Sequence, residues 1–341
     1  MQTQVSDHNV QAQRTGVTLC IPVYNGAPFL PRLLDSLLAQ TYEQWCAIVV
    51  DDLSTDQSCD VVASYAARDE RIRLVRSTVN SGSANVPILR AVGMAQTEWV
   101  CIVGQDDWLE SDYLRLLADR AAATGADIVV ARMVLTGDAG QQLQLIPAAS
   151  FNMDQVLTGL EACRLTIGQW QIGANGMLCR TRYQLAVGSE AGTEMNRDEV
   201  NTRKVLAMAG RVAFVPARYY YLIHQGSITR KITPKLFDKL ETNQALLTFV
   251  ADTYPEDPAV QACQWDACAL DVKNAHYLYW SHQDQFADNA VLPQRLQNAF
   301  EQLATMHVPQ SRHALGWLYR VGSYRLYTAV LRVKYWLHRR H

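Results

Sequence analysis

Two pairs of adjacent acidic residues stand at the ends of apolar segments in this sequence. Asp51 and Asp52 end the segment WCAIVVDD, and Asp106 and Asp107 follow WVCIVGQ. Continuous apolar runs are typical of buried strands in a parallel sheet, and open α/β sheets bind ligands at the carboxyl ends of their strands. A carboxylate at such a position can accept hydrogen bonds from a base or a ribose.

Adjacent acids at a buried strand end are costly unless they meet water, hydrogen-bond donors or a cation. Carboxylates are ligands for Mg²⁺ and Mn²⁺, which phosphate-handling sites hold through one or two carboxylates together with phosphate oxygens. A metal–diphosphate site therefore explains both acidic pairs. A structural alternative for the first pair is a strand end at which Asp52 or Asp56 caps the next helix.

The elements that must position these acids alternate along the chain from Gly16 onward. Strand-like runs cover 17–24, 45–52, 72–77 and 98–107, and helical segments cover 29–40, 58–68 and 87–96. This alternation predicts an α/β fold with a mostly parallel central sheet and helices on both faces. From residue 233 to the end almost every segment reads as helical, which predicts a helical appendage.

Composition excludes several classes of protein. The 341 residues are 49% hydrophobic with a net charge of −2, so disordered, collagen-like and nucleic-acid-binding chains are not indicated. No run approaches the ~18 apolar residues of a membrane span, and residues 1–15 read as a disordered leader without a signal-peptide core. Eight scattered cysteines without a C-x-x-C pair predict reduced thiols and a cytoplasmic location.

Four segments in register resemble the nucleotide-binding half of the family 2 glycosyltransferases, which have the GT-A fold. They are VTLCIPVYNGAPFLPRLLDSLLAQTY, IVVDDLSTDQS, IRLVRSTVNSGSA and TEWVCIVGQDDWLESDYL. The resemblance implies a GT-A domain over 16–232, with a nucleotide-sugar half at 16–110 and an acceptor half at 111–232. The helical region would then cover 233–341.

The resemblance implies roles in donor binding. Pro22, Val23 and Tyr24 would line the base pocket. Asp52 would contact the uracil or ribose, with Gly82 in the loop near the ribose. The D-x-D-type element that holds Mn²⁺ or Mg²⁺ and the diphosphate would be Asp106 and Asp107.

Two positions depart from the family pattern. Gly104 stands where the family usually has its first Asp, so metal binding must rest on Asp106 and Asp107. The usual Ala-Arg-Asn after the Ser-Gly loop is absent, and Arg90 is the candidate that would replace its donor-contacting base.

The second half of the resemblance lies in FVPARYYYLIHQGSIT and in the acidic motif before it. It implies that Asp198, with Glu199 as runner-up, is the base that takes the proton of the acceptor hydroxyl in an inverting displacement. His224 would reach the metal or diphosphate. The structural alternatives are a helix N-terminal acid for Asp198 and a packing residue for His224.

Residues 302–341 contain seven Lys and Arg and no acid, which leaves a net charge of −9 for residues 1–301. The tail 311–341 reads as a basic amphipathic helix, which suits an anionic membrane surface and a peripheral position on the inner face of the cytoplasmic membrane. Alternatively, its apolar stripe packs on the catalytic domain. The predicted stripe consists of Trp317, Val321, Tyr324, Tyr327 or Thr328, and Leu331.

The sequence thus predicts an inverting, metal-dependent glycosyltransferase that moves a sugar from a UDP-sugar to a hydroxyl of a cell-surface glycan or a lipid-linked saccharide. Nucleic acid is not an expected partner. The alternative is a degenerate, non-catalytic partner that binds a nucleotide-sugar in a glycan assembly complex, an idea motivated by Gly104 and the missing Ala-Arg-Asn.

Overall fold

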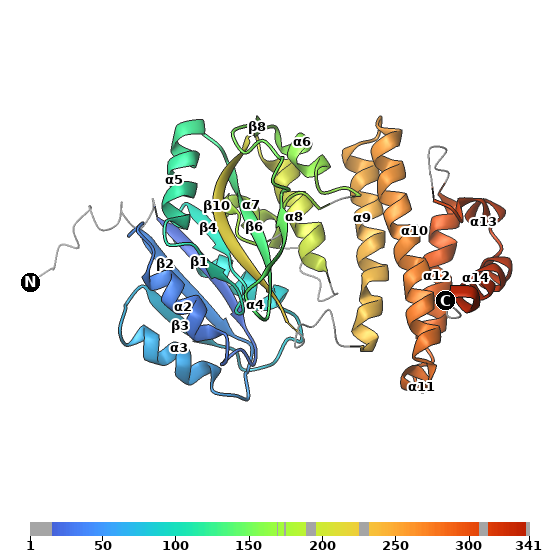
Figure 1. Ribbon diagram of the computed structural model, residues 1–341, viewed down its shortest axis with the longest axis horizontal. Helices are drawn as coiled ribbons and strands as arrows, with labels where there is room; N and C mark the ends of the chain where they lie inside the picture. Colours follow the sequence, from blue (N-terminus) through green and yellow to red (C-terminus); the bar gives the residue numbers. More distant parts are fainter. Residues whose placement is uncertain are drawn as a thin grey trace, which may run out of the picture. The chain divides into compact units, whose positions relative to one another are not determined.

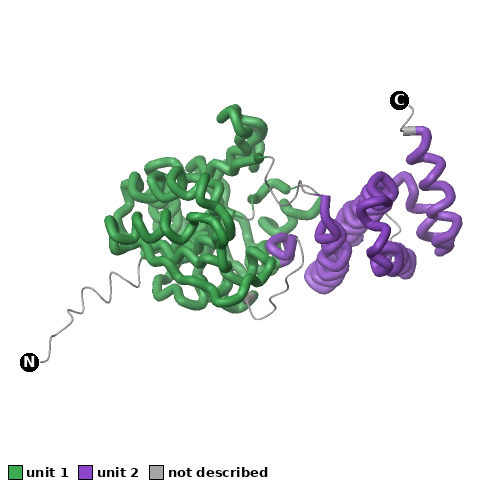
Figure 2. Tube along the Cα trace, turned by 90° about the horizontal axis from the view of Figure 1, so that it is seen from below, with its two compact units in different colours: residues 1–193, 201–227 green, residues 194–200, 228–341 purple. Residues whose placement is uncertain are grey.

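The computed structural model describes residues 16–168, 170–173, 175–188, 196–224, 232–306 and 313–338. The predicted leader 1–15 lies outside the described residues. The described residues form two compact units, and each is considered by itself. Those within 1–193 and 201–227 form the first unit, and those within 194–200 and 228–341 form the second (Figure 2).

The first unit alternates strands and helices, as the sequence predicts (Figure 1). Its first half contains β1 (Val17–Val23), α2 (Leu30–Leu38), β2 (Trp45–Asp51), α3 (Ser58–Ala66), β3 (Ile72–Arg76), α4 (Asn85–Met94), β4 (Trp99–Ile102) and β5 (Trp108–Leu109). Its second half contains α5 (Tyr113–Thr124), β6 (Ile128–Gly137), β7 (Gln142–Ile146), β8 (Val156–Leu157), α6 (Gly159–Arg164), β9 (Leu178–Arg180), α7 (Thr181–Gly188) and β10 (Val212–Ile223). Helix α8 (Arg197–Met208) begins in the second unit and continues into the first.

The strands form one sheet in the order β3-β2-β1-β4-β9-β6-β10-β5, with β7 on β6 and β8 on β10. Strands β3, β2, β1 and β4 are parallel, β9 pairs antiparallel with both β4 and β6, and β6 and β10 are parallel to each other. β6 and β10 therefore run in the same direction as β1. The predicted α/β fold with a mostly parallel sheet is confirmed.

Chain order explains how helices cover both faces of this sheet. The connections β1-α2-β2 and β2-α3-β3 step outward along the sheet, whereas β3-α4-β4 steps back past β1. Because parallel crossovers are right-handed, α2 and α3 must lie on one face and α4 on the other. Helix α2 buries Leu30, Leu33, Leu34 and Leu37, the spacing of one helical face, in the main core.

The second unit is helical, as predicted from residue 233 onward. It contains η2 (Pro234–Asp238), α9 (Lys239–Thr253), α10 (Pro258–Ser281), α11 (Gln283–Phe286), α12 (Leu292–Thr305), α13 (Gly316–Val321) and α14 (Tyr324–His338). Its own core includes Trp265, Phe300 and Tyr319. Among the residues that the structure describes, no helix is long and apolar enough to cross a bilayer.

The tail differs from the single helix that the sequence predicts. Gly322 adopts a left-handed conformation, with φ of +69°, and ends α13 before α14 begins. The prediction of one continuous apolar stripe is therefore wrong, because the break at Gly322 changes the direction in which the side chains of the two helices point. Trp317 and Val321 are exposed, whereas Tyr327 and Leu331 are buried in the core of the second unit.

Candidate functional site

Most of the predicted site residues of the first unit lie at the carboxyl edge of the sheet, and Arg90 lies in α4. The loops after β1, β2 and β4 contain Tyr24, Asp52 and Asp106, and His224 directly follows β10. Since β1, β2, β4 and β10 run in the same direction, their ends meet at one edge. Open α/β sheets bind ligands at this edge.

Asp52 is buried and organises a neighbouring loop. Its side chain is 4% exposed, and its carboxylate accepts hydrogen bonds from the Ser81 amide at 3.0 Å and the Ser81 hydroxyl at 2.8 Å. The amide of Gly82 donates to Asn80 Oδ1 at 2.8 Å, and Gly82 has a φ of +69°, which favours glycine. Asp52 thus holds the loop in which the exposed Gly82 lies.

The loop after β1 is fixed by Gln105. The amide of Tyr24 donates to Gln105 Oε1 at 2.9 Å, and Gln105 Nε2 donates to the Tyr24 carbonyl at 3.2 Å. The Tyr24 side chain is exposed, that of Pro22 is half-buried, and that of Val23 packs in the hydrophobic core. Of the three predicted base-pocket residues, Tyr24 is therefore the one whose side chain is most open to solvent.

Two non-glycine residues near these strand ends have left-handed backbone conformations. Asn25 has a φ of +49° and Leu53 a φ of +65°. The Asn25 side chain compensates by accepting from the Thr55 amide at 2.8 Å, which joins the two loops. Such conformations cost about 1 kcal/mol or more per residue and cluster at functional sites.

Asp107 is held inside the protein. Its side chain is 1% exposed, its Oδ2 accepts from the Tyr219 hydroxyl at 2.5 Å, and its Oδ1 accepts from the Leu222 amide at 3.0 Å. Burial, followed by the charge of Asp106, raises the pKa of Asp107 to about 8. Both carboxylate oxygens of Asp107 accept hydrogen bonds from donors on β10, and its predicted metal role stays a prediction.

Asp106 is the open member of the pair. Its side chain is 27% exposed, and its Oδ2 lies 3.1 Å from Nε2 of His224, whose ring also packs 4.6 Å from that of Phe29. Arg32 donates to the Asp106 carbonyl at 2.9 Å. A carboxylate oxygen beside an imidazole nitrogen is a donor pair that suits a divalent cation.

Arg32 also belongs to a stack that fixes the turn after Asp107. Its guanidinium lies 3.7 Å from the centroid of the Trp108 ring, and that ring stacks on Tyr220 at 5.0 Å with an interplanar angle of 3°. Burial lowers the pKa of Arg32, opposed by the charges of Asp107 and Asp106. The acidic turn is therefore clamped between α2 and β10.

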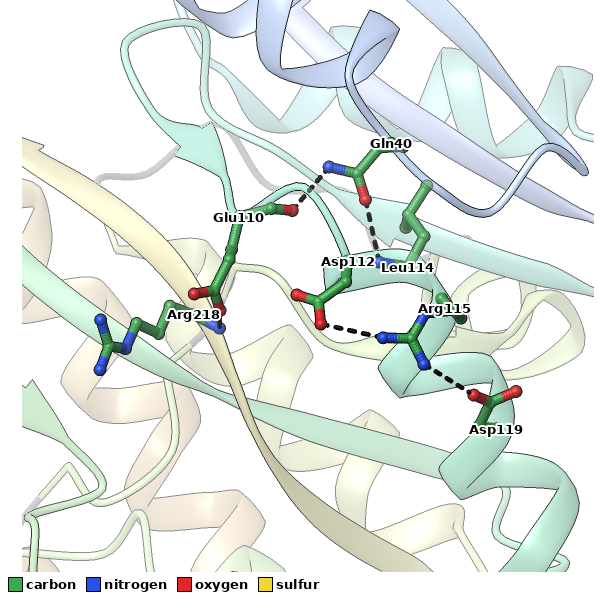
Figure 3. A network of polar contacts seen from close by, with 7 residues as sticks. All are labelled: Gln40, Glu110, Asp112, Leu114, Arg115, Asp119 and Arg218. Atoms are coloured by element: carbon green, nitrogen blue, oxygen red, sulfur yellow. Dashed lines mark hydrogen bonds and ion pairs between the residues drawn. The ribbon is translucent and has the colours of Figure 1, made fainter.

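The segment after the acidic pair is tied down by a polar network (Figure 3). Gln40 donates to the Glu110 carbonyl at 2.7 Å and accepts from the Leu114 amide at 3.0 Å. The Arg218 amide of β10 donates to the Glu110 carboxylate at 3.2 Å. On the surface of α5, Arg115 pairs with Asp112 and Asp119. These bonds hold the segment that follows the acidic turn.

Two glycines allow this close packing. A Cβ on Gly104 would lie 2.5 Å from Oδ2 of Asp107, and the Gly104 amide donates to the Tyr219 hydroxyl at 3.0 Å. Gly176 has a φ of +80°, and a Cβ there would lie 2.6 Å from the Tyr219 ring. Gly104, which stands where the family has its first Asp, therefore leaves the space that the buried Asp107 carboxylate occupies.

Three further predicted residues lie on α4 and in the first turn of α8. Arg90 is exposed and donates to the Arg76 carbonyl at 3.1 Å and the Ser77 hydroxyl at 3.2 Å. Asp198 and Glu199 lie in the first turn of α8, in the part that belongs to the second unit. Their roles stay predictions.

Sequence reasoning missed Tyr219, Gln105 and Arg32, each of which fixes part of the acidic turn. Tyr219 lies 112 residues from Asp107, within a run of three tyrosines, Tyr219 to Tyr221. Strand alternation indicates that the middle tyrosine faces away from its two neighbours, but no spacing in the sequence identifies which tyrosine meets a buried acid. Gln105 could have been suspected from the sequence, although weakly, because it lies directly before the acidic pair.

Comparisons with known proteins point to one family. Residues 18–167 match the family model described as glycosyl transferase family 2. The succinoglycan biosynthesis protein ExoO of Rhizobium meliloti is 29% identical over 220 residues, which cover 63% of this chain and 62% of that protein. The poly(ribitol-phosphate) beta-glucosyltransferase of Bacillus spizizenii is 26% identical over 210 residues, which cover 61% of this chain and 32% of that protein.

Solved structures show the same fold. The crystal structure of S. aureus TarS 1–349 aligns with a TM-score of 0.65 at 18% identity, over 90% of this chain and 87% of that chain. The same protein in complex with UDP-GlcNAc aligns with a TM-score of 0.62 at 18% identity, over 85% of this chain and 81% of that chain. Residues 18–167, which contain Asp52 and the acidic pair Asp106-Asp107, are therefore similar to the family 2 glycosyltransferases, and the chain shares the GT-A fold of structures such as TarS.

Proposed function

We propose that this chain is an inverting glycosyltransferase that moves a sugar from a UDP-sugar to a hydroxyl of a cell-surface glycan or lipid-linked saccharide. The observation that carries the proposal is the pair Asp106 and His224, 3.1 Å apart at the carboxyl edge of a parallel sheet, beside the fully buried Asp107. A carboxylate left partly exposed in an otherwise hydrogen-bonded acidic turn is placed to meet a ligand.

The donor set fits a divalent cation. Asp106 and His224 would hold Mn²⁺ or Mg²⁺, and no described group of three or more His, Cys, Asp or Glu residues forms a complete metal cage. Such ions commonly take one or two carboxylates together with substrate phosphate oxygens. When bound, the ion would neutralise the charge that develops on the leaving diphosphate.

The remaining steps belong to the residues of the chain. Asp107, held by Tyr219 and Leu222, fixes the backbone that presents Asp106. Asp198 is proposed as the base that takes the proton of the acceptor hydroxyl while its oxygen bonds to the anomeric carbon. The bond from that carbon to the diphosphate oxygen breaks with its electron pair on UDP, and the configuration inverts. Glu199 is the second candidate for the base.

The choice of donor and acceptor is supported by the similar proteins. A structural neighbour was crystallised with UDP-GlcNAc, and two relatives are named for succinoglycan biosynthesis and for glucosylation of poly(ribitol-phosphate). Because this chain covers 62% and 32% of those two relatives' lengths, their substrates guide the proposal only as a class.

Calorimetric titration of UDP and GDP, with and without Mn²⁺, tests the proposal. We expect Mn²⁺-dependent UDP binding that falls on the order of 100-fold in Asp106→Asn, the cost typical of disturbing a metal site. Asp119→Asn is the matched control, since this carboxylate is 67% exposed on the surface of α5. UDP binding by Asp106→Asn equal to that of the native chain would contradict the metal site.

Turnover separates the enzyme from its non-catalytic alternative. UDP release from UDP-sugars, with a panel of saccharide acceptors, should be lost in Asp198→Asn while UDP affinity is unchanged. Glu199→Gln tests the second candidate for the base, and loss of turnover in this variant but not in Asp198→Asn would assign the role to Glu199. Mn²⁺-dependent UDP binding by the native chain, without sugar transfer to any acceptor, would favour the nucleotide-sugar-binding partner.

A further inference from the structure

Helix α14 has two apolar faces, and one of them is buried against the described residues of the second unit. On the packed face, Tyr327 and Leu331 are fully buried, and the Tyr327 ring lies 4.6 Å from that of Phe300. At the far end of the same face, the Tyr335 hydroxyl lies 2.8 Å from the Ser281 hydroxyl of α10. These contacts fix the rotation of α14 about its own axis.

The opposite face exposes large apolar side chains. Leu326 is 39% exposed, Val333 60%, Trp336 51% and Leu337 50%. At about 100° per residue, these four positions fall within a sector of roughly 100° centred near Val333. Tyr327 and Leu331 lie outside this sector, so burial of one face leaves the other presented outward. We call these four side chains the outward stripe.

Basic residues flank the outward stripe on both sides. By the same geometry, exposed Arg325 and Arg332 lie along one edge and exposed Lys334 along the other. Arg332 also lies 5.4 Å from the ring of Trp280. The sequence from 302 to 341 contains seven Lys and Arg and no acid. An apolar stripe with a tryptophan and cationic edges has the pattern of a helix that lies in the plane of a membrane interface.

We propose that the outward stripe of α14 and its basic edges dock on an anionic lipid bilayer. The apolar side chains would enter the headgroup boundary, while the long basic side chains reach anionic headgroups at either side. A second copy of the same face is disfavoured as the occupant because it would bring two basic edges together without acids between them. This inference is independent of the proposed sugar transfer and differs from the predicted stripe, in which Tyr327 and Leu331 are buried.

Co-sedimentation with large vesicles tests the proposal on the full chain. We expect binding to vesicles of equal parts phosphatidylglycerol and phosphatidylcholine that is about tenfold stronger than to phosphatidylcholine alone, and that weakens as salt is raised. The double variant Val333→Ser with Trp336→Ser should lose about tenfold or more of this binding, because it removes the apolar centre of the stripe. Leu270→Ser, an exposed apolar position on α10, is the matched control.

Circular dichroism and UDP titration of the same variants confirm that they are folded. A further variant, Arg325→Gln with Lys334→Gln, should reduce binding to anionic vesicles and leave the binding to phosphatidylcholine unchanged. Equal binding to both vesicle types, no vesicle binding, or full binding by the double serine variant would each overturn the proposal. A dimer in sedimentation velocity that the double serine variant loses, without vesicle binding, would overturn it in favour of self-association.

Discussion

The two acidic strand ends of the first unit employ their carboxylates differently. After β2, Asp51 and Asp52 are both buried, and they accept hydrogen bonds from the Ser54 amide and from Ser81. After β4, Asp107 is equally buried, but Asp106 stays partly exposed beside His224. The same sequence pattern therefore builds a loop at one strand and presents a carboxylate at the next.

The difference comes from what packs against each strand end. The end of β2 is closed by loop residues: Ser54 supplies an amide to Asp51, and Ser81 supplies an amide and a hydroxyl to Asp52. At the end of β4, β10 contributes the Tyr219 hydroxyl and the Leu222 amide to one acid, and His224 lies against the other. An acid whose oxygens are filled by protein donors stabilises the fold, and an acid left open can bind a ligand.

The largest expected effect on stability is that of removing Asp107. Asp107→Ala should lower the free energy of unfolding by about 4 kcal/mol, because the buried Tyr219 hydroxyl and Leu222 amide lose their acceptor. Asp107→Asn, which keeps one acceptor, should lose about half as much. Urea unfolding followed by circular dichroism measures both, and a native-like midpoint for Asp107→Ala would refute the buried role.

The second-largest loss of stability is expected when the family's first Asp is restored at position 104. Gly104→Asp is expected to destabilise the chain by about 2 kcal/mol, because its Cβ would lie 2.5 Å from the fixed Asp107 carboxylate. Gly93→Ala is the control, since nothing lies within 4 Å of a Cβ at that position in α4. Thermal unfolding should show opposite shifts for the two variants. If Gly104→Asp leaves the unfolding temperature unchanged, the Asp107 side chain moves readily to make room.

A smaller loss is expected at the end of β2. Asp52→Ala should cost about 2 kcal/mol or less and Ser81→Ala about 1 kcal/mol, because the second change removes only the hydroxyl that donates at 2.8 Å. Their effects should not add, since both remove the same hydrogen bond. A double-mutant cycle by urea unfolding measures this coupling, and simple additivity would show that Asp52 does not hold the loop through Ser81.

The smallest change in stability is expected for the residue with the largest proposed role in binding. Asp106→Ala should alter the free energy of unfolding by less than about 0.5 kcal/mol, because its side chain is partly exposed. Parallel urea unfolding of Asp106→Ala and Asp107→Ala gives the sharpest comparison of the pair. Equal destabilisation by the two variants would remove the distinction between a structural and a ligand-facing carboxylate.

Much of the fold follows from local sequence pattern. The predicted strands 17–24, 45–52 and 98–107 contain β1, β2 and β4, and the predicted helices 29–40 and 58–68 contain α2 and α3. The predicted helix 87–96 overlaps α4, which begins two residues earlier. Gly125 ends α5 in a left-handed conformation, which glycine commonly adopts directly after a helix. In the tail, Gly322 ends α13 in the same way. The prediction continued one helix through Gly322 and therefore placed Trp317 and Tyr327 on the same face, whereas in the structure they belong to two helices.

The sequence by itself determined that acids stand at the ends of two buried strands, because apolar continuity and the following polar residues are local properties of the chain. It also determined the basic character of the tail. Only the tertiary structure decided that Asp107 is enclosed and Asp106 open, because Tyr219 and His224 reach them from a strand more than 100 residues away. Which face of α14 remains outward was likewise decided by packing, since periodicity marks two apolar faces and only contacts with α10 and α12 select the one that is buried.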